Sequence, residues 1–322
     1  MTAPHAARAY AGGADPDRIS ALLSACEAVD RMGVSRSPGE VRTALEAPGI
    51  DPARDIRLWE DADGELMAYA MVEIAGEETP EGTLRFRVHP AARALNLDGE
   101  VIRWAEARMR ELAAGRGAPL RLMSFARSDD KPRVFMLEWH HFRPIRFFFQ
   151  LGRALDGPIG APAFPPGFTL RGADPAQDGP AWVEMFNQTF IDHWDHHDLT
   201  LAQYTHRRQT DPGYDPRHDL IVIAPEGTFA AFCWSLINRE EMARTGRREA
   251  LLHQIGVRRG FRQMGLGRAT MLAALRALRA DGLESVRLYV DSDNPTGATR
   301  LYESVGFEKQ FTLITYAKEV GA

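Results

Sequence analysis

The pattern of apolar and turn-forming residues in this chain occurs twice, on either side of a segment rich in proline and glycine at residues 155–168. In each half, a pair of strands is followed by a strand that runs into a turn, and then by a helix, a strand and a second helix. Val88 of the first half corresponds to Val257 of the second. Two copies of one unit indicate a duplicated domain rather than a solenoid. We therefore expect two tandem domains, at residues 1–155 and 156–322.

Apolar periodicity gives the element types of the second half, and the first half follows the same order. After Gly267, apolar residues recur at helical spacing until Gly282 stops the helix. A last helix is expected with Asn294 as its N-cap and Pro295 in its first turn. The other expected helices are 179–190 and 200–209, and the expected strands are 219–224, 228–237, 250–257 and 285–291. A strand at 145–151 is expected to cross toward the partner domain and to bury Phe147 and Phe149 on one face.

Composition and charge exclude several classes of protein. With 322 residues, 44% of them apolar and 26% charged, the chain has the composition of a globular protein with room for two cores. A net charge of −5 argues against a nucleic-acid binder. Only two cysteines occur, Cys26 and Cys233, far apart and in different expected domains, so the chain offers neither a disulfide framework nor a zinc-ligand spacing. No stretch resembles a secretion signal or reaches membrane length, so we expect a cytoplasmic protein.

The stretch RRGFRQMGLGRATM at residues 258–271 joins an expected strand to an expected helix through Gly265 and Gly267. A turn of this kind gathers unpaired backbone N–H groups and the positive end of the helix dipole at one place. Glycine suits such a turn because a Cβ would keep an anion away from the backbone. The turn therefore predicts an anion site, although glycine turns of this type also occur for packing alone.

The same stretch resembles the Arg/Gln-x-x-Gly-x-Gly/Ala pyrophosphate loop of the GNAT (GCN5-related) N-acetyltransferase superfamily. Further on, DNPTGATRLYESVGF resembles the second signature of that superfamily. The resemblance is strong over residues 168–322 and weak over 18–150, and two such domains in one chain resemble the mycothiol synthases. It implies an α+β (mixed α/β) protein with two tandem acyl-CoA N-acyltransferase domains, each a mixed, mostly antiparallel sheet flanked by helices.

The resemblance also implies acetyl-CoA as cosubstrate and a set of residues that would hold it. Backbone groups of Ile255 and Val257 would bind the pantetheine arm and polarise the thioester carbonyl. Asn294 would contact the pantetheine, and Tyr302 would protonate the departing thiolate. Without the motif, Tyr302 would be read as a core aromatic residue. The pyrophosphate would lie on the N–H groups of the loop, at Arg262, Gln263, Met264, Gly265, Leu266, Gly267 and Arg268.

The general base is left open between several groups. A protonated amine must lose a proton before it attacks, so a group with a pKa near neutrality is useful. Many family members carry Glu where this chain has Leu251. His253 lies two residues further on the same face, as in arylalkylamine acetyltransferases, and Glu249 is a second candidate. His253 as a structural histidine and a relay through ordered water remain alternatives.

No metal is expected. The stretch IDHWDHHDLT at residues 191–200 is rich in Asp and His but lacks a distant second group of ligands with the spacing of a metal motif. In the family this segment lies at the acceptor wall. Its acids and histidines would suit a cationic or polyhydroxylated acceptor, and a solvated loop around Trp194 is the alternative.

The first copy lacks the chemistry of the second. Ala94, Asn96 and Asp98 stand where the loop needs small residues, and an aspartate would repel a pyrophosphate. Glu138 stands where the second copy has Tyr302. We therefore expect a degenerate N-terminal domain that binds little or no coenzyme and builds the interface with a catalytic C-terminal domain.

These observations together predict an acetyl-CoA-dependent N-acetyltransferase that acts on the primary amine of a small molecule through its C-terminal domain. One alternative is an acyltransferase of the mycothiol synthase type, and the other is a catalytically inactive acyl-CoA sensor or scaffold. No nucleic-acid or membrane partner is expected. The chain is expected to be a monomer or a homodimer.

Overall fold

A computed structural model of the chain describes residues 5–30, 36–47, 49–74, 81–114, 119–191, 198–294 and 297–321. The chain forms two compact units. Unit 1 comprises Met1–Phe147 and Leu313–Ala322, and unit 2 comprises Phe148–Thr312. The division lies eight residues before the boundary expected at residue 155, and it returns the C-terminal end of the chain to unit 1.

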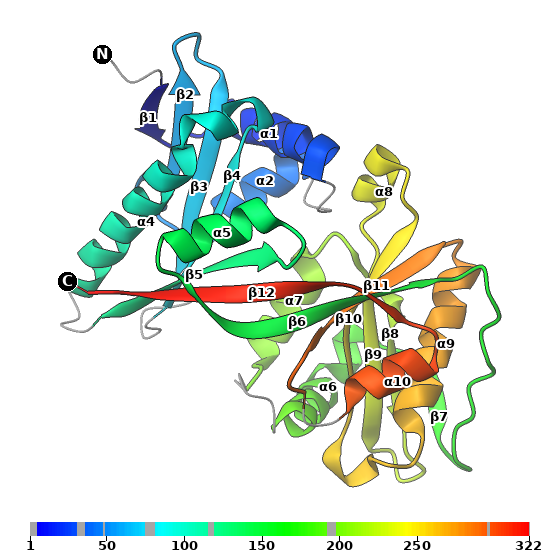
Figure 1. Ribbon diagram of the computed structural model, residues 1–322. Coiled ribbons are helices and arrows are strands. Elements are labelled where there is room, and N and C mark those ends of the chain that lie inside the picture. The colour runs from blue at the N-terminus through cyan, green and yellow to red at the C-terminus, as the bar shows by residue number, and fades with distance from the viewer. Residues whose placement is uncertain are drawn as a thin grey trace. The chain divides into compact units, whose positions relative to one another are not determined.

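Unit 1 is a sheet with helices on both faces (Figure 1). Its strands follow the order β1-β2-β3-β4-β5-β12, and only the β4–β5 pair is parallel. Helix α4 packs on one face through Val101, Ala105 and Met109, and α1 packs on the other through Ile19 and Leu22. The elements are β1 His5–Ala9, α1 Asp15–Asp30, α2 Pro38–Leu45, α3 Pro52–Asp55, β2 Ile56–Asp61, β3 Leu66–Ile74, β4 Glu81–Val88, the 3-10 helix η1 Pro90–Leu95, α4 Leu97–Ala114, β5 Leu120–Arg127 and α5 Lys131–Trp139.

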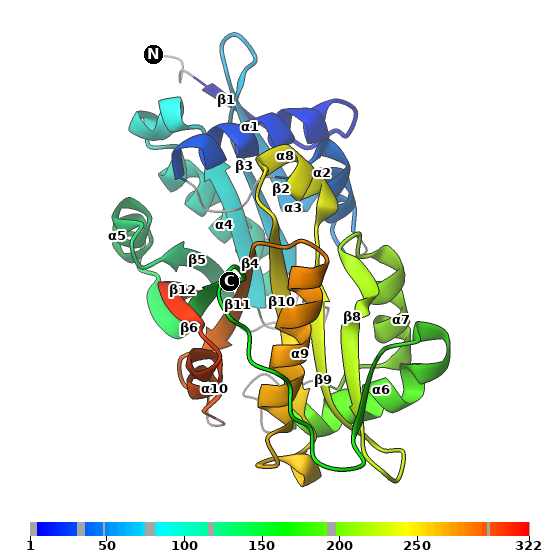
Figure 2. The ribbon, with the colours of Figure 1, turned by 90° about the vertical axis from the view of Figure 1, so that its right-hand side faces the viewer.

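Unit 2 repeats this plan with the sheet order β7-β8-β9-β10-β11-β6. Helix α9 covers one face of the sheet, and α6 and α7 cover the other (Figure 2). The elements are β7 Thr169–Gly172, α6 Pro175–Phe190, α7 Leu201–Thr210, β8 Tyr214–Ile223, β9 Phe229–Leu236, α8 Arg239–Thr245, β10 Glu249–Val257, the 3-10 helix η2 Arg259–Phe261, α9 Leu266–Ala280, β11 Ser285–Asp291 and α10 Ala298–Ser304.

Two long strands each contribute residues to both units. Strand β6, Arg143–Ala154, begins in unit 1 and ends in unit 2, whereas β12, Glu308–Val320, runs from unit 2 into unit 1. The expected crossing of the strand at 145–151 is therefore confirmed. Its expected buried face is wrong at Phe147, which is 40% exposed, while Phe149 is partly buried.

Helix α9 forms because its apolar residues fall on one side. Met271, Leu275 and Leu278 are spaced by four and three residues and are buried against the sheet. The chain turns away after Asp281 at Gly282, whose φ of +81° lies in the left-handed region. This end agrees with the sequence-based prediction.

The last helix begins later than expected. Helix α10 starts at Ala298, with Gly297 at its N-cap in a left-handed conformation. Asn294 is therefore not the N-cap. Its carbonyl instead accepts a hydrogen bond from the Gly297 N–H at 3.5 Å, within the turn that follows β11. Pro295 lies outside the described residues.

Helix α8 was not anticipated from the sequence. In the part of the chain that the structure describes, no helix is long and apolar enough to cross a membrane.

Candidate active site

Strands β10 and β11 separate shortly after they meet. Their parallel ladder joins only Glu249–Leu251 to Ser285–Arg287. Beyond this point, β10 continues to pair with β9 on its other side, as far as Val257 opposite Ala231. The edge of β10 from residue 252 to 257 thus forms no ladder with β11, and its backbone polar groups on that side can bind a ligand.

The glycine turn lies at the end of this open edge. Gly265 is the N-cap of α9 with φ +81°, and Gln263 also has a positive φ, +64°. Among the described residues, no side chain caps the helix, so the N–H groups of its first turn are available. Around Gly265, none of the residues that the structure describes lies within 4 Å of the place where a Cβ would be. The uncapped, open end of a 15-residue helix fits a pyrophosphate.

Gly267 has a different role from Gly265. A Cβ at Gly267 would meet Leu301 at 3.3 Å and Val257 at 3.4 Å. The start of α9, the end of β10 and the helix α10 therefore meet at this glycine. The two sequence motifs, separate in the chain, are thereby brought together.

The Arg262 side chain points back into the protein. Its guanidinium donates to the carbonyl oxygen of Thr189 at 2.9 Å and to that of Val257 at 3.4 Å. These bonds tie the loop to the end of α6 and to β10. The other predicted loop residues Gln263, Met264 and Arg268 are exposed, whereas Leu266 is buried against the sheet.

Tyr302 follows Leu301 on α10 and is buried in the core of unit 2. Only 7% of it is exposed, and its ring meets Phe307 edge-on at 6.1 Å. Burial raises the pKa of its hydroxyl, which stays protonated at neutral pH. A protonated hydroxyl can donate its proton to a ligand.

His253 lies at an irregularity of β10. The register with β9 shifts between Leu252 and Gln254, which makes His253 the extra residue of a β-bulge. Its ring lies 4.6 Å from that of Trp234, yet more than a third of the residue is exposed to solvent. Desolvation by the surrounding protein and, to a lesser extent, the positive charge of Arg207 lower the pKa of the His253 imidazole. The imidazole is therefore neutral at pH 7 and can accept a proton.

Glu249 is bound within the protein. Its carboxylate accepts hydrogen bonds from Arg287 at 2.5 Å and from the Ser285 hydroxyl at 3.3 Å, both on β11. It lies where the two strands are still paired, four residues before His253. An ion-paired carboxylate at the closed end of the opening is a poor base for an amine near the open edge.

A buried ion pair behind Trp234 was missed from the sequence. Arg208 of α7 donates to Asp219 of β8 at 3.0 Å, and both side chains are almost inaccessible to solvent. Trp182 also donates to this carboxylate, at 3.1 Å, and the Arg208 guanidinium lies 4.2 Å from the Trp234 ring. The aspartate at the start of an apolar strand was a signal, since an isolated charge seldom enters a core without a partner.

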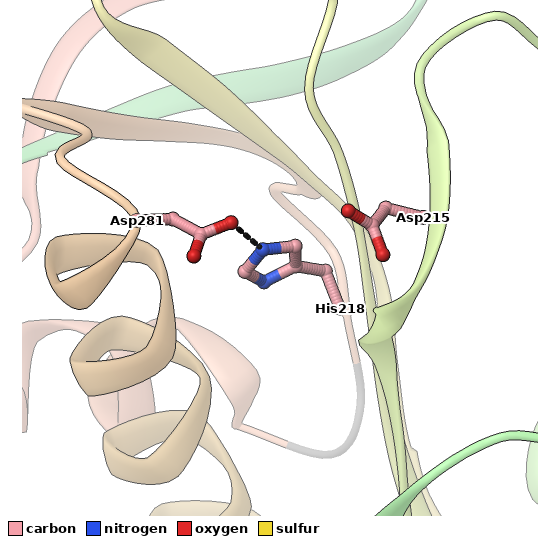
Figure 3. A group of neighbouring side chains, drawn as sticks. All are labelled: Asp215, His218 and Asp281. Atoms are coloured by element: carbon pink, nitrogen blue, oxygen red, sulfur yellow. Dashed lines mark hydrogen bonds and ion pairs between the residues drawn. The ribbon is translucent and has the colours of Figure 1, made fainter.

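Asp215, His218 and Asp281 form a cluster at the edge of unit 2, between β8 and the end of α9 (Figure 3). His218 contacts Asp281 at 2.9 Å, and Arg217 pairs with Asp215 at 2.6 Å and with Asp281 at 3.3 Å. Because Arg217 already compensates the carboxylates, the cluster serves to fasten the end of α9 to β8. The predicted acidic and histidine-rich stretch at 192–197 lies outside the described residues.

Comparisons with known proteins agree with this geometry. The model of the acetyltransferase (GNAT) family matches residues 180–307. The mycothiol acetyltransferase of Thermobispora bispora is 31% identical over 304 residues, which cover 94% of this chain and 96% of that protein. The mycothiol acetyltransferase of Salinispora tropica is 31% identical over 320 residues, with coverages of 94% and 97%.

Solved structures share the fold over the whole chain. A GCN5-related N-acetyltransferase from Sphaerobacter thermophilus has a TM-score of 0.79 at 24% identity and covers 100% of this chain and 98% of its own. A tandem GNAT protein from the clavulanic acid biosynthesis pathway has a TM-score of 0.76 at 17% identity, with 99% of each chain covered. With relatives aligned over nearly its full length and with the strand opening and glycine turn in place, this chain belongs to the GNAT family of acetyltransferases, which transfer an acetyl group from acetyl-CoA to an amine.

Proposed function

We propose that unit 2 performs the transfer and that its acceptor is the primary amine of a small molecule. One observation carries the proposal. At Gly267, the open edge of β10, the uncapped start of α9 and the helix bearing Tyr302 meet within van der Waals distance. A binding edge, an anion site and a proton donor therefore lie around one place.

The residues that fit the cosubstrate belong to this junction. Acetyl-CoA, when bound, supplies the acetyl group as an activated thioester. Backbone groups of Ile255 and Val257 hold the pantetheine arm, and the N–H groups from Gln263 to Arg268 hold the pyrophosphate. Asn294, in the turn after β11, adds a polar contact to the arm. Arg262 keeps the loop in place through Thr189.

His253 and Tyr302 divide the proton transfers between them. The neutral imidazole of His253 accepts the proton that the acceptor nitrogen loses. The hydroxyl of Tyr302 gives its proton to the sulfur of the leaving group. Glu249 is the weaker candidate for the base because Arg287 and Ser285 already hold its carboxylate.

Two candidate functions differ in the acceptor: an amine related to mycothiol, or a different small-molecule amine. The relatives are named mycothiol acetyltransferases, so an amine related to mycothiol is the first acceptor to test. Leu251 stands where many family members carry a glutamate base, and His253 takes over the base role on the same face. This change favours an acceptor different from that of glutamate-bearing enzymes, held against the α6–α7 side of the sheet.

Unit 1 is proposed to bind no coenzyme. The N-terminal turn of α4 carries Asp98 and Glu100, whereas the same turn of α9 has no acidic residue. Carboxylates there repel a pyrophosphate. Unit 1 therefore serves as a structural partner of the catalytic unit.

The test combines isothermal titration with acetyl-CoA and an assay of free-thiol release with a panel of primary amines. We expect one coenzyme site per chain and thiol release that depends on the amine. Two sites would contradict the role given to unit 1. Binding without thiol release for every amine would contradict the proposed transfer, and no binding at all would contradict the site at Gly265.

A further inference from the structure

The β-bulge at His253 changes which side chains of β10 face α6 and α7. In a regular strand, successive residues point to opposite faces. Here Leu252 pairs with Ser235 and Gln254 pairs with Trp234, so an extra residue stands between them. Paired residues of neighbouring strands share a face, and therefore Gln254 lies on the Trp234 face. His253 packs on Trp234 from the same side. The bulge thus sets His253 and Gln254 next to each other on one face.

Gln254 and Trp234 carry two buried polar atoms that lack hydrogen-bond partners. The amide oxygen Oε1 of Gln254 and the indole Nε1 of Trp234 are both inaccessible to solvent, and neither is bonded to any residue that the structure describes. The Gln254 oxygen is a hydrogen-bond acceptor, and the Trp234 indole N–H is a donor. Because buried polar atoms in native proteins are nearly always bonded, an unpaired donor and acceptor beside a proposed base indicate a ligand group.

The side chains behind Trp234 make no hydrogen bond to these atoms, and the Tyr204 hydroxyl in the same cluster is also without a partner among the described residues. The Arg208 guanidinium and the Tyr214 hydroxyl both donate to Asp219. The two open atoms themselves are uncharged, so they suit a neutral partner. A hydroxyl fits because it can accept from the indole N–H and donate to the amide oxygen. An ammonium or a carboxylate would satisfy only one of the two and would lose its hydration.

We propose that Gln254 and Trp234 form a subsite that binds a hydroxyl group of the acceptor, close to the amine that His253 deprotonates. This inference rests on the proposed function of unit 2. It makes the two residues determinants of acceptor specificity and gives the bulge a purpose, since a regular strand would turn Gln254 to the α9 face.

The experiment compares matched amines with and without the hydroxyl. The pairs are 3-amino-1,2-propanediol with propylamine and 2-aminocyclohexanol with cyclohexylamine, and the readout is the ratio of kcat/KM within each pair. We expect the wild-type protein to prefer the hydroxylated amine by roughly 10-fold or more. Gln254→Met removes the whole carboxamide, Trp234→Phe removes the indole N–H together with part of the ring, and each should bring the ratio to about 1–2.

Two exposed residues serve as matched controls. Gln209→Met on α7 and Trp139→Phe on α5 make the same chemical changes at exposed positions and should keep the wild-type ratio. An unchanged ratio in both site variants would overturn the proposal.

A second readout does not depend on turnover. The four amines are added to the wild-type protein and to the two site variants in the presence of CoA, and the shift in Tm is measured. A larger shift with the hydroxylated amines that disappears in both variants supports the subsite, even if no amine is acetylated and the proposed function fails. Equal shifts within each pair would overturn the subsite even if acetyl transfer is observed.

Discussion

The two strand–turn–helix segments of this chain have nearly the same backbone and opposite chemistry. In both units, the strand before the turn leaves its parallel neighbour after three residue pairs, Glu81–Thr83 with Arg121–Met123 in unit 1 and Glu249–Leu251 with Ser285–Arg287 in unit 2. In both, the residue before the helix has a positive φ, +57° at Asn96 and +81° at Gly265. The geometry that opens a sheet for a ligand is therefore present twice.

The difference lies in a few side chains at the opening. Asp98 and Glu100 place carboxylates in the first turn of α4, and burial raises the pKa of Asp98. The counterpart of Tyr302 is Glu138, whose carboxylate accepts a hydrogen bond from the Tyr316 hydroxyl at 3.1 Å. In unit 1, the residue at this position is therefore a hydrogen-bond partner of strand β12. The fold therefore depends on apolar periodicity, which survives in both copies, while activity depends on positions that can change without loss of the fold.

The largest effect is expected from removing the hydroxyl of Tyr302. Tyr302→Phe should lower kcat by ~10²–10⁴-fold with little change in acetyl-CoA affinity, because the ring still packs while the proton donor is lost. Stopped-flow thiol release and isothermal titration measure the two quantities. Glu138→Gln is the counterpart in unit 1 and should leave kcat at the wild-type value. Equal rates for Tyr302→Phe and the wild-type protein would remove Tyr302 from the mechanism.

Each unit contains a buried arginine–aspartate ion pair, and the two pairs differ in how many partners the arginine has. Asp219→Ala leaves the Arg208 guanidinium buried without its carboxylate and should lower the free energy of unfolding by roughly 3–5 kcal/mol. Asp55→Ala in unit 1 should cost less, because Arg108 retains a second partner, Glu111, at 3.0 Å. Urea denaturation checks both variants. A larger loss of unfolding free energy in Asp55→Ala than in Asp219→Ala would contradict this prediction.

A smaller effect is expected from carrying the charge of unit 1 into unit 2. Gly267→Asp places a carboxylate where Asp98 stands in α4, and should weaken acetyl-CoA binding by roughly 10-fold or more through repulsion. Gly267→Ala is the matched control for the crowding of Leu301 and Val257. Titration calorimetry at two salt concentrations distinguishes them, since only the aspartate effect should shrink with salt. Equal losses in both variants would assign the effect to packing.

The smallest change is expected in the pH dependence of kcat. A histidine can act as a base only while its imidazole is neutral. Because the pKa of His253 is lowered, its imidazole stays neutral as the pH falls past the ordinary histidine pKa of ~6.5. We expect kcat to fall by less than about twofold between pH 7 and 5.5. The steeper loss of kcat that follows protonation of the base should appear only below this range. Glu249→Gln should leave this profile unchanged. An acid limb near pH 6.5 that persists in His253→Gln would assign the titration to another group.

Much of the fold could be predicted because local patterns encode it. The period of Met271, Leu275 and Leu278 predicted α9 between Gly267 and Gly282, and the helix begins one residue earlier, at Leu266. The repeated order of elements predicted two units, and the two motifs predicted the family. Helix α8, the start of α10 and the exposure of Phe147 were not predicted, because short helices and strand faces depend on what packs beside them.

Motifs within one turn or one strand specify which residues could do chemistry. The fold then sets which of these residues are free to act. It bound Glu249 to Arg287, turned Arg262 toward Thr189, buried Arg208 against Asp219 and inserted the bulge that sets Gln254 beside Trp234. It also returned the C-terminal strand to unit 1. The physical reason is that ion pairs, strand registers and bulges join residues far apart in the chain, and no local pattern specifies their partners.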